Sequence, residues 1–198
     1  MRITSEILEL CRSIDKKDNI FEHNYNRKLR DSIVTVTDKE SKIILEFLYA
    51  VTELWAWEDN EVIFSNPVIN LLDGTKLDFT IPSESLTNTA NYLIENLECR
   101  FLIALICDTM WVLKKDSIYG HKALKSYICH AEEIFDSENW TTTFSALKRA
   151  YNIACSLGKS EKKDMGSYIH KVIVDVDGAD SLFFSIKLID TNLILKQN

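Results

Sequence analysis

Hydrophobic residues recur along most of this chain at the three- and four-residue intervals of amphipathic helices. From about residue 4 to 15 they are Ile7, Leu8, Leu10, Cys11 and Ile14. A second apolar stripe predicts a helix from about 37 to 58, and Thr37 to Glu40 has the order of a capping box at its start. Residues 16–32, between these helices, are polar and weakly periodic, so a loop or frayed linker is expected there.

The segment from residue 60 to 82 interrupts the helical pattern. It contains both prolines of the chain, Pro67 and Pro82, and an Asp73-Gly74 pair between short apolar runs. An Asp-Gly pair is a turn signal that is typical of hairpins. The pattern therefore predicts either a small hairpin or an extended loop that lies on the helices.

Helical periodicity is strong from residue 83 to the end. The helices are expected at about 83–96, 97–116, 119–136, 140–157, 160–176 and 179–196, with Gly158 as a left-handed residue after the fourth. Short connections favour antiparallel neighbours. We therefore predict an all-α protein of about seven stacked antiparallel helices, either a bundle or a short α-solenoid of the tetratricopeptide type. Residues 1–82 and 83–198 would form its two parts, within one continuous domain.

Composition and charge exclude several classes of protein. The formal net charge is −7 and the pI is about 5.2, which argues against a protein that mainly grips phosphate backbones. The five cysteines form no Cys-x-x-Cys pair, so neither a disulfide scaffold nor a zinc ribbon is indicated. The first residues lack a long apolar run, and the longest apolar stretch, 101–107, is too short to span a bilayer. A cytoplasmic protein without membrane contact is expected.

No catalytic motif is present in the sequence. A phosphate-binding glycine loop, a serine nucleophile elbow and a dinucleotide-binding motif are all missing, and an enzyme is not favoured. His130 and Glu133 lie one helical turn apart beside Cys129, but a metal site in a helical bundle would need ligands from other helices as well. We expect no metal and no cofactor.

Two charged residues lie on the most apolar predicted helix. Arg100 and Asp108 are separated by two helical turns and are expected on one side, among Phe101, Leu105 and Trp111. Buried charges are costly unless they are paired. The sequence predicts a structural ion pair, either between these two residues or with adjacent helices.

Residues 12–30 contain a basic patch with aromatic residues in it. Six basic residues face three acidic ones, for a net charge of +3, and Phe21 and Tyr25 are among them. Aromatic and basic side chains together can hold single-stranded nucleic acid, although most such runs are solvated surfaces. The patch proper is expected to consist of Lys16, Lys17, Arg27, Lys28 and Arg30.

The four tryptophans are candidates for an interface. Trp55 and Trp57 cannot both face inward on one helix, because two residues span about 200°. Tryptophan is also enriched at interface hot spots. We therefore expect that some of Trp55, Trp57, Trp111 and Trp140 contact a partner.

One stretch carries a resemblance to known proteins. Residues 98–127, with Arg100, Asp108 and Trp111, followed by Trp140 and by 147–158, resemble an uncharacterised helical region near the N-terminus of some larger bacterial proteins. Some of those proteins have a HEPN-like domain further on. The resemblance covers about 60 residues and implies no activity, because no histidine here has an arginine four to seven places upstream, as the HEPN ribonuclease motif requires.

These observations favour a non-catalytic helical binding or scaffold module that engages a protein partner. The resemblance implies that it is the N-terminal module of a larger bacterial assembly. The alternatives are an accessory domain of a nuclease or toxin enzyme, and a subunit that contacts nucleic acid through residues 12–30. Nucleic-acid contact is not favoured.

Overall fold

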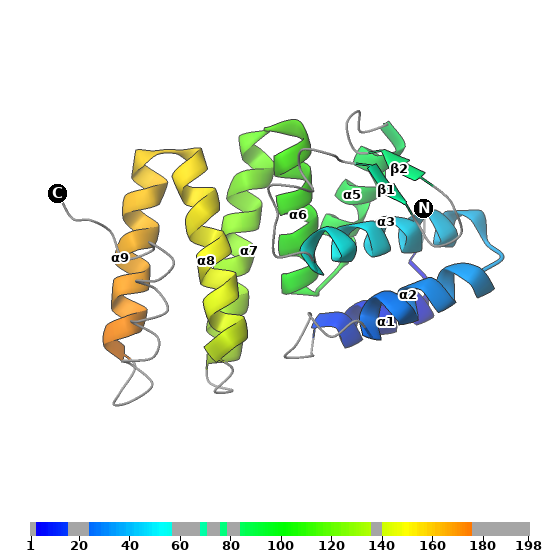
Figure 1. Cartoon of the computed structure of the whole chain (residues 1–198), viewed down its shortest axis with the longest axis horizontal. Helices are drawn as coiled ribbons and strands as arrows, with labels where there is room; N and C mark the ends of the chain where they lie inside the picture. The colour runs from blue at the N-terminus through cyan, green and yellow to red at the C-terminus, as the bar shows by residue number, and fades with distance from the viewer. Residues whose placement is uncertain are drawn as a thin grey trace. The chain divides into compact units, whose positions relative to one another are not determined.

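The computed structural model describes residues 3–15, 24–56, 68–70, 76–78, 84–135 and 140–175. These residues form eight helices and one two-stranded hairpin (Figure 1). The predicted all-α class is confirmed. The helices are α1 (Ser5–Asp15), α2 (Asn24–Thr35), α3 (Lys39–Ala56), α5 (Glu84–Asn96), α6 (Arg100–Lys114), α7 (Ser117–Phe135), α8 (Trp140–Leu157) and α9 (Lys159–Asp175).

The chain groups into two compact units, Met1–Tyr119 and Gly120–Asn198. Helix α5 packs against α3 and α6, and α6 packs against α1 and α3, so both helices belong to the first unit. The division at residue 83 within one continuous domain stays a prediction.

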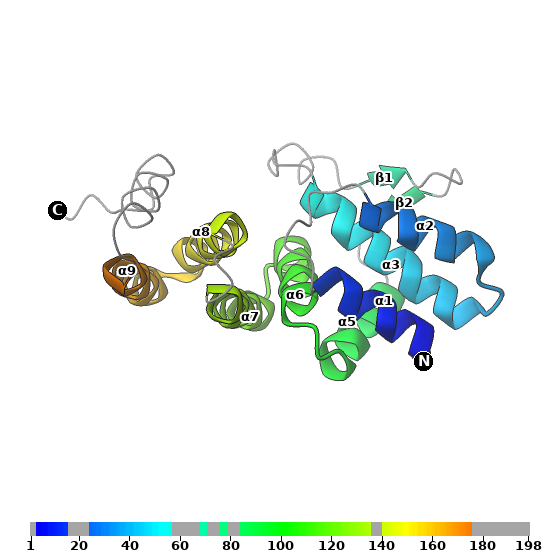
Figure 2. The ribbon, with the colours of Figure 1, turned by 90° about the horizontal axis from the view of Figure 1, so that it is seen from below.

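In the first unit, α6 is buried along most of its length. Nine of its fifteen residues are buried, on every side of the helix, from Phe101 to Met110. A helix that is apolar all round must be covered all round. Figures 1 and 2 show α6 running across α3, and α1 and α5 cover further faces of it.

Helix α2 was not predicted. Residues 24–32 fall in the segment that was expected to be a loop or frayed linker, yet they form a helix that continues to Thr35. Its apolar stripe is narrow: Leu29 and Ile33 are buried, one turn apart, and α2 packs against α3. Two apolar residues give too weak a periodic signal, and packing against α3 provides the rest of the stabilisation.

The hairpin lies where the helical pattern breaks. Strand β1 (Val68–Asn70) pairs antiparallel with β2 (Lys76–Asp78), and Ile69 is opposite Leu77. Of the two predictions for residues 60–82, the described part therefore supports the hairpin. The Asp73-Gly74 pair lies outside the described residues.

The second unit holds most of α7 with α8 and α9, which lie side by side in both views (Figures 1 and 2). Small and apolar residues at helical spacing form the buried faces, as with Ala123, Tyr127 and Ala131 on α7. The helix expected at 179–196 lies outside the described residues. None of the described helices is long and apolar enough to cross a membrane.

Two helix ends differ from expectation. Gly158, between α8 and α9, does not adopt the left-handed conformation predicted for it. Its amide donates to the Ala154 carbonyl, and its own carbonyl accepts from the Lys162 amide, as in a helix. The left-handed residue is Lys115, with φ of 55° and ψ of 24°, which ends α6.

Candidate functional site

A pocket of about 350 Å³ lies in the first unit, where α1, the end of α2 and the start of α3 meet. Small-molecule and side-chain pockets generally begin at about 300 Å³. Five hydroxyl-bearing residues, two acids and four aliphatic residues line it. They are Thr4, Glu6, Ile7, Leu10, Ser32, Thr35, Val36, Thr37, Asp38, Ser41 and Leu45.

Asp38 closes one side of the pocket as the cap of α3. Its Oδ2 accepts a hydrogen bond from the Ser41 amide at 2.8 Å. The predicted capping box placed Thr37 in this role, so the cap is one residue further along the chain. Aspartate is as good an N-cap as serine or asparagine, and its charge opposes the helix dipole favourably.

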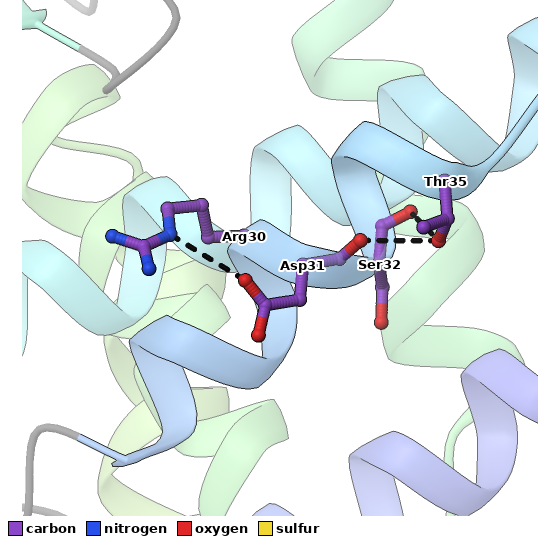
Figure 3. A network of polar contacts seen from close by, with 4 residues as sticks. All are labelled: Arg30, Asp31, Ser32 and Thr35. Atoms are coloured by element: carbon purple, nitrogen blue, oxygen red, sulfur yellow. Dashed lines mark hydrogen bonds and ion pairs between the residues drawn. The ribbon is translucent and has the colours of Figure 1, made fainter.

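The end of α2 also contributes to the pocket wall, through Ser32 and Thr35. The Thr35 hydroxyl donates to the carbonyl of Asp31 at 3.0 Å and to that of Ser32 at 3.2 Å (Figure 3). The Arg30 Nε lies 3.6 Å from the Asp31 Oδ1 on the same helix. Three residues then connect α2 to α3, which brings Thr35, Thr37 and Asp38 close together in space.

Helix α1 contributes the second carboxylate of the pocket. The Thr4 Oγ1 accepts from the Ile7 amide at 3.3 Å and so caps the helix. The pKa of the Glu6 carboxyl lies below the usual range. The main cause is hydrogen bonding to its own backbone amide, and the second is the Thr4 hydroxyl. The pKa of Asp38 is also lowered. The Ser41 hydroxyl is the larger cause and the Ser41 amide the second, because both stabilise the carboxylate anion. Both carboxylates are therefore ionised at neutral pH.

Ser41 is the unusual residue of the pocket. It is only 2% exposed, and its hydroxyl has no hydrogen-bond partner among the described residues. The hydroxyl lies near enough to Asp38 to affect its charge, but only the Ser41 amide meets hydrogen-bond geometry with that carboxylate. Buried hydroxyls in native proteins nearly always have a partner. The Ser41 hydroxyl oxygen is enclosed by the protein, so it lies behind the pocket wall and not in the pocket.

The described lining offers hydrogen-bond acceptors and negative charge. Of the described residues that form the pocket, none is lysine, arginine, histidine or cysteine. A serine or threonine nucleophile needs a nearby base, and carboxylates with a lowered pKa are weak bases at neutral pH. Hydroxyl and carboxylate oxygens together suit a ligand that donates hydrogen bonds and carries positive charge.

Residues 4–166 match a known family, described as a domain of unknown function (DUF7380). The chain belongs to this family. The match covers every residue of the pocket and ends within α9. No curated protein and no solved structure matches the chain. The DUF7380 match also contains the stretch 98–158, on which the sequence resemblance rests, and agrees with an uncharacterised domain.

Within the DUF7380 domain, the predicted ion pair falls on α6. Asp108 is 2% exposed, whereas Arg100 is exposed at the first turn, so only one of the two is a buried charge. Eight residues of helix rise by about 12 Å, which is long for direct contact. The ion pair therefore stays a prediction, and neither residue lines the pocket.

The predicted tryptophan interface is only partly described. Trp111 is half-buried on α6, and its carbonyl accepts the Lys115 amide at 2.8 Å. Trp55 and Trp140 lie in α3 and α8, but their side chains are outside the described set, as is Trp57 altogether. Their role as interface residues stays a prediction.

The basic patch is divided by the structure. Lys28 is exposed and Arg30 is half-buried, both on α2, and Arg30 is near the Asp31 carboxylate. Lys16, Lys17 and the side chain of Arg27 lie outside the described residues. None of the described basic residues lines the pocket.

The second unit contains a buried histidine and a tyrosine–glutamate contact. His130 is 4% exposed on α7, and burial lowers its pKa to about 4. The Tyr168 hydroxyl donates to the Glu132 Oε1 at 3.2 Å, and burial is the first cause that raises the pKa of Tyr168. The described residues contain no group of three histidine, cysteine or acidic side chains arranged to hold a metal. His170 has no described side chain.

Sequence reasoning missed the pocket entirely. Its residues are common serines, threonines and acids, and they come from three helices, one of which was not predicted. One local signal could have indicated part of it: Thr37, Asp38 and Ser41 lie together just before an apolar helix. That signal identifies a cap, but not a cavity beside it.

Proposed function

We propose that this chain is a non-catalytic binding module that engages a protein partner. The observation that supports the proposal is the pocket of the first unit, whose described lining combines hydroxyl-bearing and aliphatic residues with the ionised carboxylates of Glu6 and Asp38. Helical stacks also expose extended surfaces that suit proteins and peptides.

The test is to isolate the tagged chain from its native cell after chemical cross-linking. Proteins recovered with it are identified by mass spectrometry, and the cross-linked residues are mapped. A stoichiometric partner with cross-links to residues 4–45 supports the proposal. Turnover of a substrate by the purified chain, or the absence of any stoichiometric protein partner, would overturn it.

We further propose that the domain is a module of a larger bacterial assembly, as the resemblance of residues 98–158 implies. The family match supports a domain of this extent, from residue 4 to 166. Native mass spectrometry of the tagged protein, purified from its own cell, tests this. A module of an assembly should be found in complexes with other subunits in a fixed ratio. Recovery of the chain alone, at every ionic strength, would contradict it.

The role in contacting nucleic acid has weaker support. The chain as a whole is acidic, and Asp31, which lies 3.6 Å from Arg30, lowers the net charge of α2 from +3 to +2. Binding to phosphates depends steeply on salt. Filter binding of single-stranded RNA at low salt should show no retention, and retention that falls with added salt would favour this role over a protein partner.

A further inference from the structure

Two side-chain contacts join α7 to α9 in the second unit. Near the start of both helices, the His121 Nε2 lies 3.3 Å from the Glu161 Oε1. Further along, the Tyr168 hydroxyl donates to the Glu132 Oε1 at 3.2 Å. The two helices run in the same direction, because α8 returns antiparallel between them along the chain (Figure 1). Side chains therefore hold α9 to α7 at two places along their length.

The start of α9 positions Glu161 for its contact. Glu161 is the third residue of the helix, and a β-carbon at Gly158 would lie 2.9 Å from its Oε2, so glycine leaves room for the carboxylate. The pKa of Glu161 lies below its ordinary value. The main cause is hydrogen bonding to its own backbone amide, and the second is the His121 side chain. Glu161 is therefore ionised at neutral and mildly acidic pH.

The two contacts differ in their response to pH. Histidine is the side chain whose ordinary pKa, about 6.5, places its change of charge between pH 5 and 8. When the His121 ring is protonated, its contact with Glu161 becomes an ion pair, which is stronger than a hydrogen bond between a neutral ring and a carboxylate. The contact of Tyr168 with Glu132 contains no histidine. Only one of the two contacts should therefore weaken as the pH rises through neutrality.

The other charged or titratable side chains of the surrounding described turns are exposed. They are Lys122 and Lys125 on α7, Cys155 at the end of α8, and Lys159, Lys162, Lys163 and Asp164 on α9. The lysines oppose protonation of His121, whereas the Glu161 carboxylate in direct contact favours it. Two further histidines belong to these helices: His130 is buried on α7, and the side chain of His170 on α9 lies outside the described residues.

We propose that His121 and Glu161 form a pH-dependent latch, which holds the start of α9 on α7 more tightly when the His121 ring is protonated. Tyr168 and Glu132 stay in contact at either pH, so α9 loosens from its N-terminal end as the pH rises. The His121 side chain is 54% exposed, so solvent screens the pair, and the effect should be about two- to fivefold. The latch is independent of the pocket in the first unit.

Amide hydrogen exchange in the isotope-labelled full chain tests the latch, with rates corrected for the intrinsic effect of pH. The probes are the amides of residues 162–165, the first of which donates to the Gly158 carbonyl at 3.1 Å. We expect their protection to be about two- to fivefold higher at pH 5.5 than at pH 7.5. Burial lowers the pKa of His130 to about 4, which makes the whole fold less stable in acid, so a gain there cannot come from that residue.

Four variants identify the groups that act. His121→Gln and Glu161→Gln should each remove the dependence on pH, and Glu161→Gln should also move the titration of the His121 ring protons to lower pH. Tyr168→Phe is the matched control for the other contact, and it should lower protection by the same factor at both pH values. His170→Gln should leave the dependence on pH unchanged.

Three results would overturn the inference. They are equal protection of residues 162–165 at the two pH values, a dependence on pH that survives in His121→Gln, and a titration of the His121 ring that is the same in Glu161→Gln and the parent. Each variant is compared only if the buried Ala123 and Tyr127 on α7 keep their amide shifts. The ring titration in the parent and Glu161→Gln decides the question even if a variant alters the exchange of α9 for other reasons.

Discussion

At the scale of single residues, the amide and the hydroxyl of Ser41 differ in how well each is satisfied. Its amide stabilises the start of α3 through Asp38, while its buried hydroxyl has no partner among the described residues. A buried polar group without a partner destabilises the fold by about 1–3 kcal/mol. Proteins commonly retain such unfavourable groups at functional sites.

Replacing this hydroxyl should therefore not destabilise the protein. Ser41→Ala keeps the amide hydrogen bond to Asp38, and we expect an unfolding free energy that is unchanged or higher by about 1 kcal/mol. Thr52→Val is the matched control, since the Thr52 hydroxyl is also buried but donates to the Leu48 and Tyr49 carbonyls. That variant should lose about 1 kcal/mol. Urea denaturation measures both, and equal losses would show that the Ser41 hydroxyl is structurally satisfied.

His130 should make stability depend on pH. Burial lowers its pKa from 6.5 to about 4, so between these values the unfolded chain binds a proton that the folded protein does not. The stability is complete above about pH 6.5 and falls as the pH decreases towards 4. At pH 5 the loss should be about 2 kcal/mol from this residue.

The measurement is urea denaturation at about pH 7.5 and pH 5. His130→Leu should reduce the difference between the two pH values by about 2 kcal/mol relative to the parent. His121→Gln is the comparison variant: His121 is exposed on the same helix, and its Nε2 lies 3.3 Å from the Glu161 Oε1. This pair favours the folded protein when the ring is protonated, so its loss should not reduce the difference between the two pH values. If the parent and the His130→Leu variant lose the same free energy of unfolding between the two pH values, His130 is protonated as easily in the folded protein as in the unfolded chain.

At the scale of elements, periodicity identified the helices that have broad apolar faces. Helix α2 was not predicted, because among its described side chains only Leu29 and Ile33 are buried. Helix ends were also less predictable, because an end depends on backbone geometry that several residues can satisfy. Glycine was expected at the left-handed position, yet Lys115 holds it after α6, whereas Gly158 continues as helix.

Lys115 therefore offers a simple stabilising substitution. A residue with a β-carbon is strained by about 1–2 kcal/mol in the left-handed region, and glycine is not. Lys115→Gly should raise the unfolding free energy by about 0.5–1 kcal/mol, since the glycine also gains freedom in the unfolded chain. Lys115→Ala keeps the β-carbon and should show no gain. Thermal unfolding compares the two, and equal melting temperatures would mean that α6 ends differently.

At the scale of the molecule, the fold class followed from sequence, but the candidate site did not. A long run of helical periodicity needs only local information, so the all-α class was accessible. The pocket requires Thr4, Thr35 and Ser41 to meet from three helices, and the sequence gives no distances between them. Charge was informative in one respect: the acidic balance of the whole chain reappears locally as two ionised carboxylates without a basic neighbour in the lining.

The stability of the first unit should depend most on α6. Its residues from Phe101 to Met110 are buried with few exceptions, and α1, α3 and α5 all pack on it, so its amides should open only when the unit unfolds. Hydrogen exchange should accordingly be slowest in α6 and faster at the end of α2, where Val34 is 75% exposed.

Leu102→Ala removes a fully buried side chain and should lower the free energy of unfolding by about 2–5 kcal/mol. If Leu102→Ala accelerates hydrogen exchange in α6, α3 and α1 together, α6 is the centre of one cooperative unit. If exchange accelerates in α6 alone, α1 and α3 keep the pocket folded without it.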